Sequence, residues 1–316
     1  MTQEAVDRLV GLLGVRYPVL QAGMGTATSP DLVAAVSDGG GLGILGCLRR
    51  RPDDVRRLIG DIREKTSRPF GANHVIAHLN REALAVTLEE RVPVISTAWG
   101  DATDVVRDAH AAGAVVVHQV NTVEEAIRAA AAGVDAVVAQ GSDGGGHVGH
   151  RTTFTLVPQI VDVVSPLPVL AAGGVVDARG VAAALVLGAA GVLLGTRFVA
   201  TPEAPVAEGW KQAIVSATGD DTVSTKLYDA IRGESWPGAL VRTVRNRWTD
   251  EWAGRPEEWA AVAEELRPSF LESMAAGEFP MAGEGAGLIR DLTPAGDLPR
   301  ALWEGALAIL RESRSL

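Results

Sequence analysis

The feature that most constrains the fold is a repeated alternation of short apolar runs with helical patterns between residues 18 and 194. Most of the runs lack the polar alternation of a half-exposed strand, which is typical of strands buried on both faces of a parallel sheet. Eight strand–helix units joined by short connections predict a (β/α)8 TIM barrel. The predicted strands span residues 18–21, 42–45, 70–76, 92–96, 114–117, 134–139, 168–171 and 191–194.

An open, doubly wound sheet is the competing architecture for the same alternation. Such a sheet would be expected to carry a dinucleotide-binding glycine pattern directly after its first strand. The segment Gly23-Met-Gly25-Thr-Ala-Thr28 lacks the third glycine of that pattern. The sequence therefore favours the barrel.

The alternation stops near Thr201-Pro202, and the following segment is rich in tryptophan. We expect residues 204–279 to form a mainly helical cap after the eighth strand. Its tryptophans could fill a small core of their own, or wall the substrate side of the barrel mouth. Residues 298–310 read as an amphipathic outer helix, so the predicted barrel comprises residues 1–203 and 280–316.

Composition excludes several classes of function. The formal net charge is −10, and no long basic run is present, which argues against nucleic acid or an anionic membrane as a partner. The single Cys47 fits a reducing compartment. The first residues do not resemble a signal peptide, and no segment reaches the roughly 18 apolar residues of a membrane span. We expect a cytoplasmic protein.

The chemistry of such barrels lies at the carboxyl ends of the strands. Neutral polar side chains follow the predicted strands at Asn73, Gln119 and Gln140, which suits a polar heterocycle better than a metal. Ala22, Gly23 and Met24 follow the first strand.

The sixth strand runs into Gly144, Gly145 and Gly146, followed by His147. Glycines there permit close approach of a ligand, and a histidine can carry a proton near neutral pH, although a structural turn is an open alternative. His150 is a second candidate. No metal is expected, because these histidines and Asp143 lack a third strong ligand at a suitable spacing.

Two glycine-containing turns follow the seventh and eighth strands, at Gly173-Gly174 and Gly195-Thr196. Barrels commonly hold a phosphate on backbone N–H groups at this strand pair. Each turn alone reads equally well as an ordinary tight turn. Together they predict a phosphate site.

These motifs resemble the nitronate monooxygenase family, formerly called 2-nitropropane dioxygenases, which are FMN-dependent barrels. The resemblance implies that His147 is the catalytic base. It places Ala22, Gly23, Met24, Asn73, Gln119, Gln140, Gly145 and Gly146 near the flavin, and Gly173, Gly174, Gly195 and Thr196 at its phosphate. The matching segments are 18–24, 34–43, 140–149, 172–175, 187–191, 195–198 and 283–287.

The implied activity is oxidation of alkyl nitronates by O2 to carbonyl compounds and nitrite, with neutral nitroalkanes as a further substrate class to test. The same glycine–histidine loop also resembles FMN-dependent reductases that use NADH or NADPH, of the quinone or enoyl-acyl-carrier-protein type. A non-enzymatic flavin carrier is a third alternative. The loop here reads Asp143-Gly-Gly-Gly-His147, whereas the family usually has Glu-Ala-Gly-Gly-His. We expect a small-molecule substrate and leave a homo-oligomer open.

Overall fold

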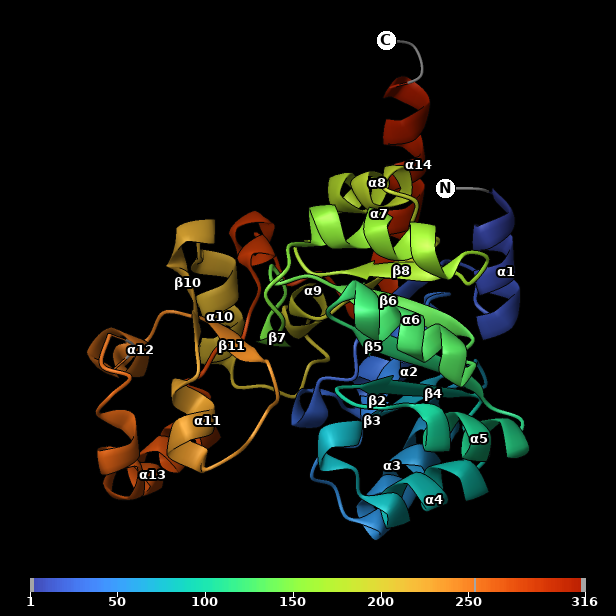
Figure 1. Cartoon of the computed structure of the whole chain (residues 1–316). Helices are drawn as coiled ribbons and strands as arrows, with labels where there is room; N and C mark the ends of the chain where they lie inside the picture. Colours follow the sequence, from blue (N-terminus) through green and yellow to red (C-terminus); the bar gives the residue numbers. More distant parts are fainter. Residues whose placement is uncertain (1–2, 253, 314–316) are drawn as a thin grey trace.

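A computed structural model describes residues 3–252 and 254–313 and contains an eight-stranded parallel sheet (Figure 1). The strand order is β1-β9-β8-β6-β5-β4-β3-β2. A parallel bridge between Leu20 and Leu42 joins the two end strands, so the sheet closes and the barrel prediction is confirmed. The strands are β1 (Val19–Gln21), β2 (Ile44–Gly46), β3 (Gly71–Val75), β4 (Val94–Ala98), β5 (Val115–Val120), β6 (Ala136–Gln140), β8 (Val169–Ala172) and β9 (Gly191–Leu194).

Gln21 stabilises the barrel seam with its side chain. The Ile44 amide donates to Gln21 Oε1 at 3.1 Å, and Gln21 Nε2 donates to the Ile44 carbonyl at 3.2 Å. The side chain is completely buried, so these bonds replace the water that the amide would otherwise bind. Gln21 therefore has a structural place between β1 and β2.

Helix α1 (Gln3–Leu13) covers one end of the barrel and was not predicted. Its Leu9 and Leu13 are buried in one cluster with residues from inside the barrel, among them Ile44 and Val138. Burying a leucine side chain is worth about 1.5–3 kcal/mol. The apolar contact of α1 with the barrel interior therefore leaves the opposite end, at the carboxyl ends of the strands, for a site.

Two of the outer helices begin with a serine or threonine side-chain cap. Ser29 accepts a hydrogen bond from the Leu32 amide at 3.1 Å with Pro30 in the first turn, and Thr122 accepts from the Glu125 amide at 3.1 Å. The helices are α2 (Pro30–Asp38), α3 (Pro52–Lys65), α4 (Arg81–Glu89), α5 (Thr103–Ala111), α6 (Val123–Ala132), α7 (Thr153–Val164), α8 (Ala178–Val186) and α9 (Thr196–Val199).

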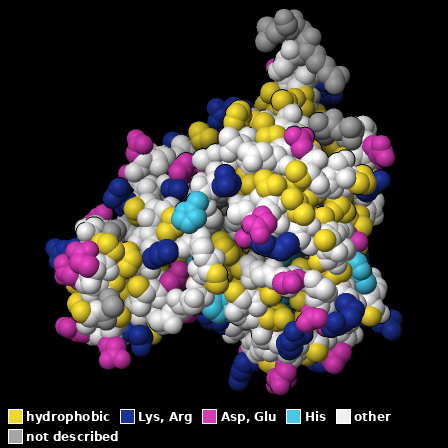
Figure 2. Space-filling model, in the orientation of Figure 1, with side chains coloured by type: hydrophobic (Ala, Val, Ile, Leu, Met, Phe, Trp, Pro, Cys, Tyr) yellow, Lys and Arg dark blue, Asp and Glu magenta, His cyan; other side chains and the backbone are white. Residues whose placement is uncertain are grey.

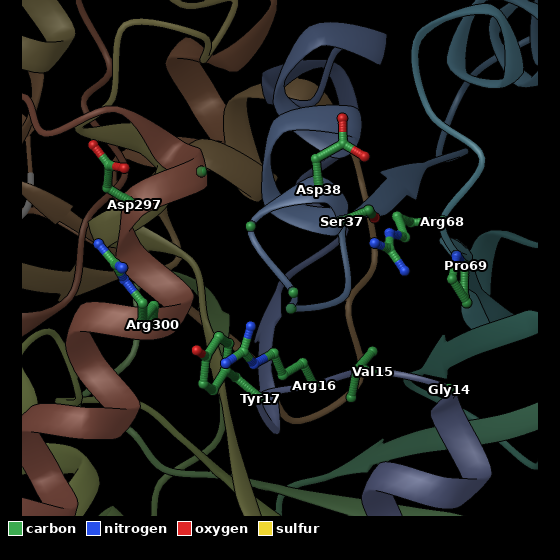
Figure 3. A pocket seen from close by; sticks show the side chains of 14 residues that line it. Gly14, Val15, Arg16, Tyr17, Ser37, Asp38, Arg68, Pro69, Asp297 and Arg300 are labelled. Carbon is green, nitrogen blue, oxygen red and sulfur yellow. The ribbon is translucent and has the colours of Figure 1, made fainter.

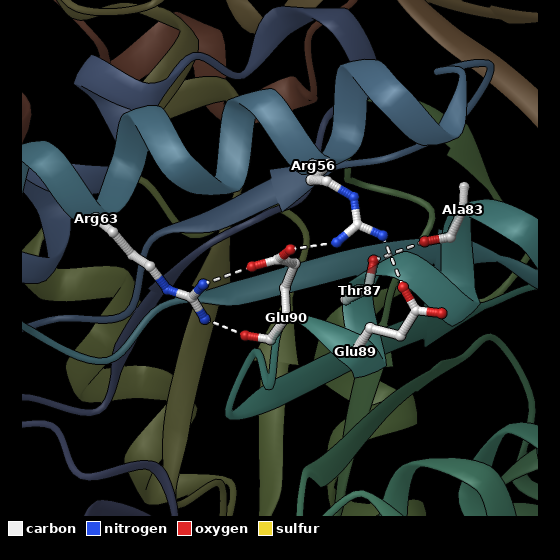
Figure 4. A network of polar contacts seen from close by, with 6 residues as sticks. All are labelled: Arg56, Arg63, Ala83, Thr87, Glu89 and Glu90. Carbon is white, nitrogen blue, oxygen red and sulfur yellow. Dashed lines mark hydrogen bonds and ion pairs between the residues drawn. The ribbon is translucent and has the colours of Figure 1, made fainter.

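Helices α3 and α4 are also joined by a surface ion-pair network (Figure 4). Arg56 pairs with Glu89 at 2.6 Å and also contacts Glu90, and Arg63 pairs with Glu90 at 2.8 Å. Exposed pairs of this kind contribute about 0–1 kcal/mol each. They align the helices, while the buried side chains Val55, Ile59, Ile62 and Val86 supply most of the stability.

Acidic and basic side chains are interspersed over the face shown in Figure 2. In the described part of the chain, no helix has both the length and the apolar character needed to cross a bilayer.

The segment after the barrel strands is mainly helical, as predicted, but it also contributes two strands. Its elements are α10 (Glu208–Ser216), β10 (Thr222–Thr225), α11 (Leu227–Arg232), β11 (Leu240–Val244), α12 (Arg247–Trp252) and α13 (Trp259–Ala275). Strand β11 lies between β10 and a short strand β7 (Gly146–Val148), which is the end of the glycine–histidine loop. The barrel loop is thus built into the antiparallel sheet of the following segment. The domain boundaries stay a prediction.

A compact aromatic core stabilises this segment. Tyr228, Phe270 and Phe279 are almost fully buried, and Trp248 is 5.1 Å from the Phe270 ring, edge on. One tryptophan therefore fills the segment's own core. Helix α14 (Leu298–Ser313) then packs on α8 as the predicted outer helix, and a side-chain carbon at Gly305 would lie 2.8 Å from that of Ala178.

Candidate active site

The polar side chains predicted at the strand ends lie on neighbouring strands and contact one another. Asn73 on β3 donates to Ser96 on β4 at 3.0 Å. Gln119 on β5 donates to Gln140 at the end of β6 at 2.9 Å, and Asn121 donates to the same oxygen at 2.8 Å. These neutral donors and acceptors form two hydrogen-bonded groups at the carboxyl ends of the neighbouring strands β3 to β6, here called the polar rim.

The histidines adjacent in sequence to Asn73 and Gln119 point to the other face of the sheet, because successive side chains of a strand alternate. His74 contacts the Thr87 hydroxyl of α4 at 3.0 Å, and His118 contacts Thr97 at 2.8 Å. Burial lowers the pKa of each imidazole to about 4. Both histidines are buried and have structural hydrogen bonds.

The segment after β1 packs tightly against this rim. A side-chain carbon at Gly23 would lie 2.2 Å from the Asn73 Cβ, so only glycine fits there. The Ala22 amide donates to the Leu194 carbonyl of β9 at 2.9 Å, and Met24 Sδ lies 3.5 Å from where a Gly195 side chain would begin. The ends of β1, β3 and β9 therefore meet at one place.

The predicted phosphate turns have both packed and open glycines. Gly173 and Gly174 have φ angles of +98° and +68°, which favour glycine. A side chain at Gly173 would collide with Thr153 and the Gly141 carbonyl, whereas at Gly174 the nearest atom is the Asp143 Cβ at 3.4 Å. Gly195 likewise has only Met24 within 4 Å. A side-chain carbon at Gly174 or Gly195 would thus make only ordinary contacts, whereas Gly173 is a packing residue.

The chain returns from the following segment to cover the glycine loop. A side-chain carbon at Gly283 would lie 2.4 Å from the Asp143 carbonyl, and one at Gly145 would lie 2.6 Å from Ala282. The Gly283 amide donates to the Thr196 hydroxyl oxygen at 3.0 Å. Gly145 therefore serves close packing, and Thr196 lies against this returning segment.

Gly146 differs from its neighbours. It is the first residue of β7, its φ is +71°, and nothing lies within 4 Å of where a side-chain carbon would stand. It leaves open space directly before His147.

His147 has two side-chain partners, and sequence reasoning missed the first of them. Its Nε2 lies 3.0 Å from Asp229 Oδ1, and the two side chains are only 16% and 11% exposed. Its ring stacks on the indole of Trp236, with centroids 3.6 Å apart and planes 14° from parallel. Asp229 belongs to α11 and Trp236 to the loop before β11.

Further aromatic side chains surround this stack. The His78 ring is 4.6 Å from the Trp236 ring, and Trp99, at the end of β4, is 6.1 Å away and edge on. Trp99 has an unusual φ of +60°, which turns the chain sharply after the strand. The His147 ring therefore contacts one aromatic ring directly, and that ring has two further aromatic neighbours.

A small cluster of charged side chains contacts Trp236. Trp236 Nε1 donates to Glu234 at 3.3 Å, Arg232 pairs with Glu234 at 2.7 Å, and Arg49 also contacts Glu234. Burial lowers the pKa of Arg232, and neighbouring Arg49 lowers it further, while Glu234 and Asp229 oppose the shift. The charges of Asp229 and Glu234 are thus balanced by two guanidinium groups.

His150 lies outside this group. It is exposed, and it has no hydrogen bond or ion pair with residues 3–252 or 254–313. Within the same described ranges, no three His, Cys, Asp or Glu side chains are grouped as metal ligands.

Two cavities of about 270 and 420 Å³ open at the other end of the barrel, on loops that precede the strands. The smaller is bordered by Arg16, Arg68 and Arg300, together with Asp38 and Asp297 (Figure 3). Neither includes a residue of the polar rim or the His147 group. The candidate site therefore rests on the convergence of side chains and open glycines.

Comparison with known proteins points to one family. A family model described as nitronate monooxygenase matches residues 7–83 and 77–305. A protein of Staphylococcus aureus strain Newman named probable nitronate monooxygenase is 34% identical over 292 residues, which cover 78% of this chain and 80% of that protein.

Two solved structures extend the likeness to nearly the whole chain. FabK from Thermotoga maritima is 35% identical with a TM-score of 0.87, over 98% of both chains. A nitroalkane oxidase from Streptomyces ansochromogenes is 28% identical with a TM-score of 0.82, over 97% of this chain and 99% of that one.

Proposed function

Because the chain belongs to the nitronate monooxygenase family, whose members are oxidoreductases, we propose that it uses FMN and O2 to oxidise alkyl nitronates to carbonyl compounds and nitrite. The observation that carries the proposal is the position of His147. It is paired with a buried carboxylate and follows a glycine with open space around it, at the barrel end where (β/α)8 enzymes hold their sites.

The residues at the strand ends fit a flavin mononucleotide. Gly174 and Gly195 leave their backbone uncovered by a side chain of their own, and the Thr196 hydroxyl belongs to the residue after Gly195, which suits a phosphate. Asn73, Gln119 and Gln140 offer amide donors and acceptors for the polar edge of the ring system. When bound, the flavin supplies the redox chemistry with O2.

The protein's own residues would handle the proton and the solvent. A neutral nitroalkane must lose an α-proton to become a nitronate, and His147 is the titratable group that both stacks on Trp236 and pairs with a carboxylate. A positioned general base typically contributes about 10²–10⁴-fold in rate. Trp236 and Trp99 would form the apolar walls that keep water from the reacting carbon.

A reductase that takes hydride from NADH or NADPH is the second candidate. The 35% identity to FabK over 98% of both chains favours it, since the identity to the nitroalkane oxidase is lower. The polar rim and His147 would serve either reaction, so the site geometry does not separate them.

Steady-state oxygen uptake, measured with nitrite release, tests the proposal. The FMN-loaded protein is given a preformed alkyl nitronate, or NADH, or NADPH, in parallel reactions. We expect oxygen uptake and nitrite with the nitronate, and background rates with both nicotinamides. Rapid NADH or NADPH oxidation without nitronate turnover would replace the proposal with the reductase, and no turnover of any of the three would contradict both.

A further inference from the structure

We propose that Asp229 is a positioning residue that fixes His147 in the tautomer with the proton on Nε2, leaving Nδ1 as the atom that accepts a proton from the substrate. The inference rests on the proposed role of His147 as a base. It adds a residue from outside the barrel strands to the chemistry.

The contact between the two side chains requires a proton. His147 Nε2 and Asp229 Oδ1 are 3.0 Å apart, and a carboxylate oxygen can only accept. If the neutral imidazole carried its proton on Nδ1, two lone pairs would face each other in a mostly buried place. The Nε2–H tautomer removes that repulsion and forms a charge-assisted hydrogen bond.

The other ring nitrogen is left for the reaction. Nδ1 has no hydrogen-bond partner among the described residues, and it is not one of their buried unpaired polar atoms. One face of the ring is covered by Trp236, which stacks and offers no acceptor in the ring plane. Nδ1 is therefore both unprotonated and open, which are the two properties that a base needs.

The carboxylate is held in place by the aromatic core of the segment after the barrel. Asp229 is 8% exposed on α11, between Tyr228, which is 1% exposed, and Ile231, which is fully buried. The His147 backbone is fixed from the same side, because β7 pairs with β11 and sets His147 opposite Val241. Both partners of the hydrogen bond are thus positioned by one sheet and one core.

Other charged side chains lie close to the His147–Asp229 pair. Arg232 is close enough to feel the charge of Asp229, and it shares Glu234 with Arg49. A guanidinium group therefore lies near the carboxylate of the pair.

Nitrogen-15 NMR of the FMN-loaded protein, labelled in its six histidines, reads the tautomer directly. The signals of His147 are assigned by their loss in His147→Asn. We expect Nε2 protonated and Nδ1 unprotonated in the wild type, and a larger Nδ1–H fraction in both Asp229→Ala and Asp229→Asn. The Asp229→Asn side chain keeps the shape of Asp, so a change of tautomer in this variant cannot be attributed to a folding defect. The matched control is Asp250→Ala, an exposed carboxylate on α12, which should leave the His147 signals unchanged.

Kinetics add a second readout. We expect Asp229→Ala to reduce turnover of a neutral nitroalkane by about 10-fold or more. The loss should not exceed the about 10²–10⁴-fold that a positioned base contributes in total. Turnover of a preformed nitronate should stay within about twofold of the wild-type rate. Asp229→Glu should restore part of the lost rate. Equal loss on both substrates, with no rescue, would mean that Asp229 only supports the fold.

The two proposals fail separately. A wild-type His147 protonated on Nδ1, or a tautomer unchanged in both Asp229 variants, would overturn the assignment even in an active enzyme. If instead the wild type oxidises no nitro compound but shows the Nε2–H tautomer, and Asp229→Ala loses it, the proposed reaction falls and the positioning role stands.

Discussion

Three histidines of one chain show how surroundings decide what an imidazole does. His74 and His118 lie inside strands, bond to threonine hydroxyls and are almost completely buried, so protonating them is costly. His147 lies at the end of a glycine loop, with a carboxylate on one nitrogen and open space before it at Gly146. The residue type is the same, and only the third environment suits proton transfer.

At the scale of single residues, the first prediction concerns His147 itself. Replacing it with Asn should abolish turnover of neutral nitroalkanes, by about 10²-fold or more, because the base is lost. FMN should stay bound, and preformed nitronate, which has already lost the proton, should still be oxidised. His150→Asn is the control and should do far less, since that side chain is exposed. Full activity of His147→Asn on a neutral nitroalkane would remove His147 from the mechanism.

The buried histidines give a prediction about pH and stability. Their pKa of about 4 lies below the ordinary value of about 6.5, so below pH 6.5 the unfolded chain binds more protons than the folded one. The free energy of unfolding therefore falls as pH is lowered from about 6.5 to 4, by about 2 kcal/mol per histidine between pH 7 and 5.

Urea unfolding at pH 7 and pH 5 measures this loss. The double variant His74→Gln, His118→Gln should be less stable than the wild type at pH 7 but should lose less stability on going to pH 5. His150→Gln should behave as the wild type does at both pH values. If the wild type and the double variant lost the same free energy of unfolding between pH 7 and pH 5, the lowered pKa of His74 and His118 would be contradicted.

At the scale of the element, the strands and their ends could be read from the sequence, whereas the sheet that joins β7 to β11 could not. Asn73, Gln119 and Gln140 were predictable because parallel strands of a barrel end on one side. Asp229 was not, because its approach to His147 depends on a pairing between residues about a hundred positions apart. A local signal for the strands did exist, since residues 222–225 and 240–244 are rich in β-branched side chains.

The glycine turns give a prediction at the same scale. Gly174→Val should weaken FMN binding more than it weakens the fold, because a side chain makes only ordinary contacts there but would obstruct close approach of a phosphate to the backbone. Its positive φ adds strain, so a matched control is needed. Gly113→Val has a similar φ of +78°, lies in open space before β5 and so away from the carboxyl ends of the strands, and should cost stability alone.

Flavin fluorescence titration gives the dissociation constant of each variant, and urea unfolding without FMN gives its stability. The expected result is similar destabilisation in both variants with weaker FMN binding only in Gly174→Val. Wild-type affinity in Gly174→Val would place the phosphate elsewhere.

At the scale of the whole molecule, the barrel followed from periodicity because each strand and helix repeats a local pattern. Closure at Leu20 and Leu42, and the plugging of one end by α1, came from packing that no local pattern describes. Helix α1 closes one end of the barrel, and the antiparallel sheet joins the barrel through β7 at the other end, which is the end left for chemistry. The fold thus accounts for where the site lies, and the chemistry of its side chains for what it can do.

The central claim is that a nitronate, and not a nicotinamide, delivers electrons to an FMN held at this end of the barrel. Anaerobic mixing of the FMN-loaded protein with an alkyl nitronate, NADH or NADPH, followed by visible flavin absorbance, tests it most directly. The account predicts that the nitronate bleaches the flavin within a single turnover and that neither nicotinamide does so at a comparable rate. Bleaching by NADH or NADPH while the nitronate leaves the flavin oxidised, or a protein that takes up no FMN, would contradict it.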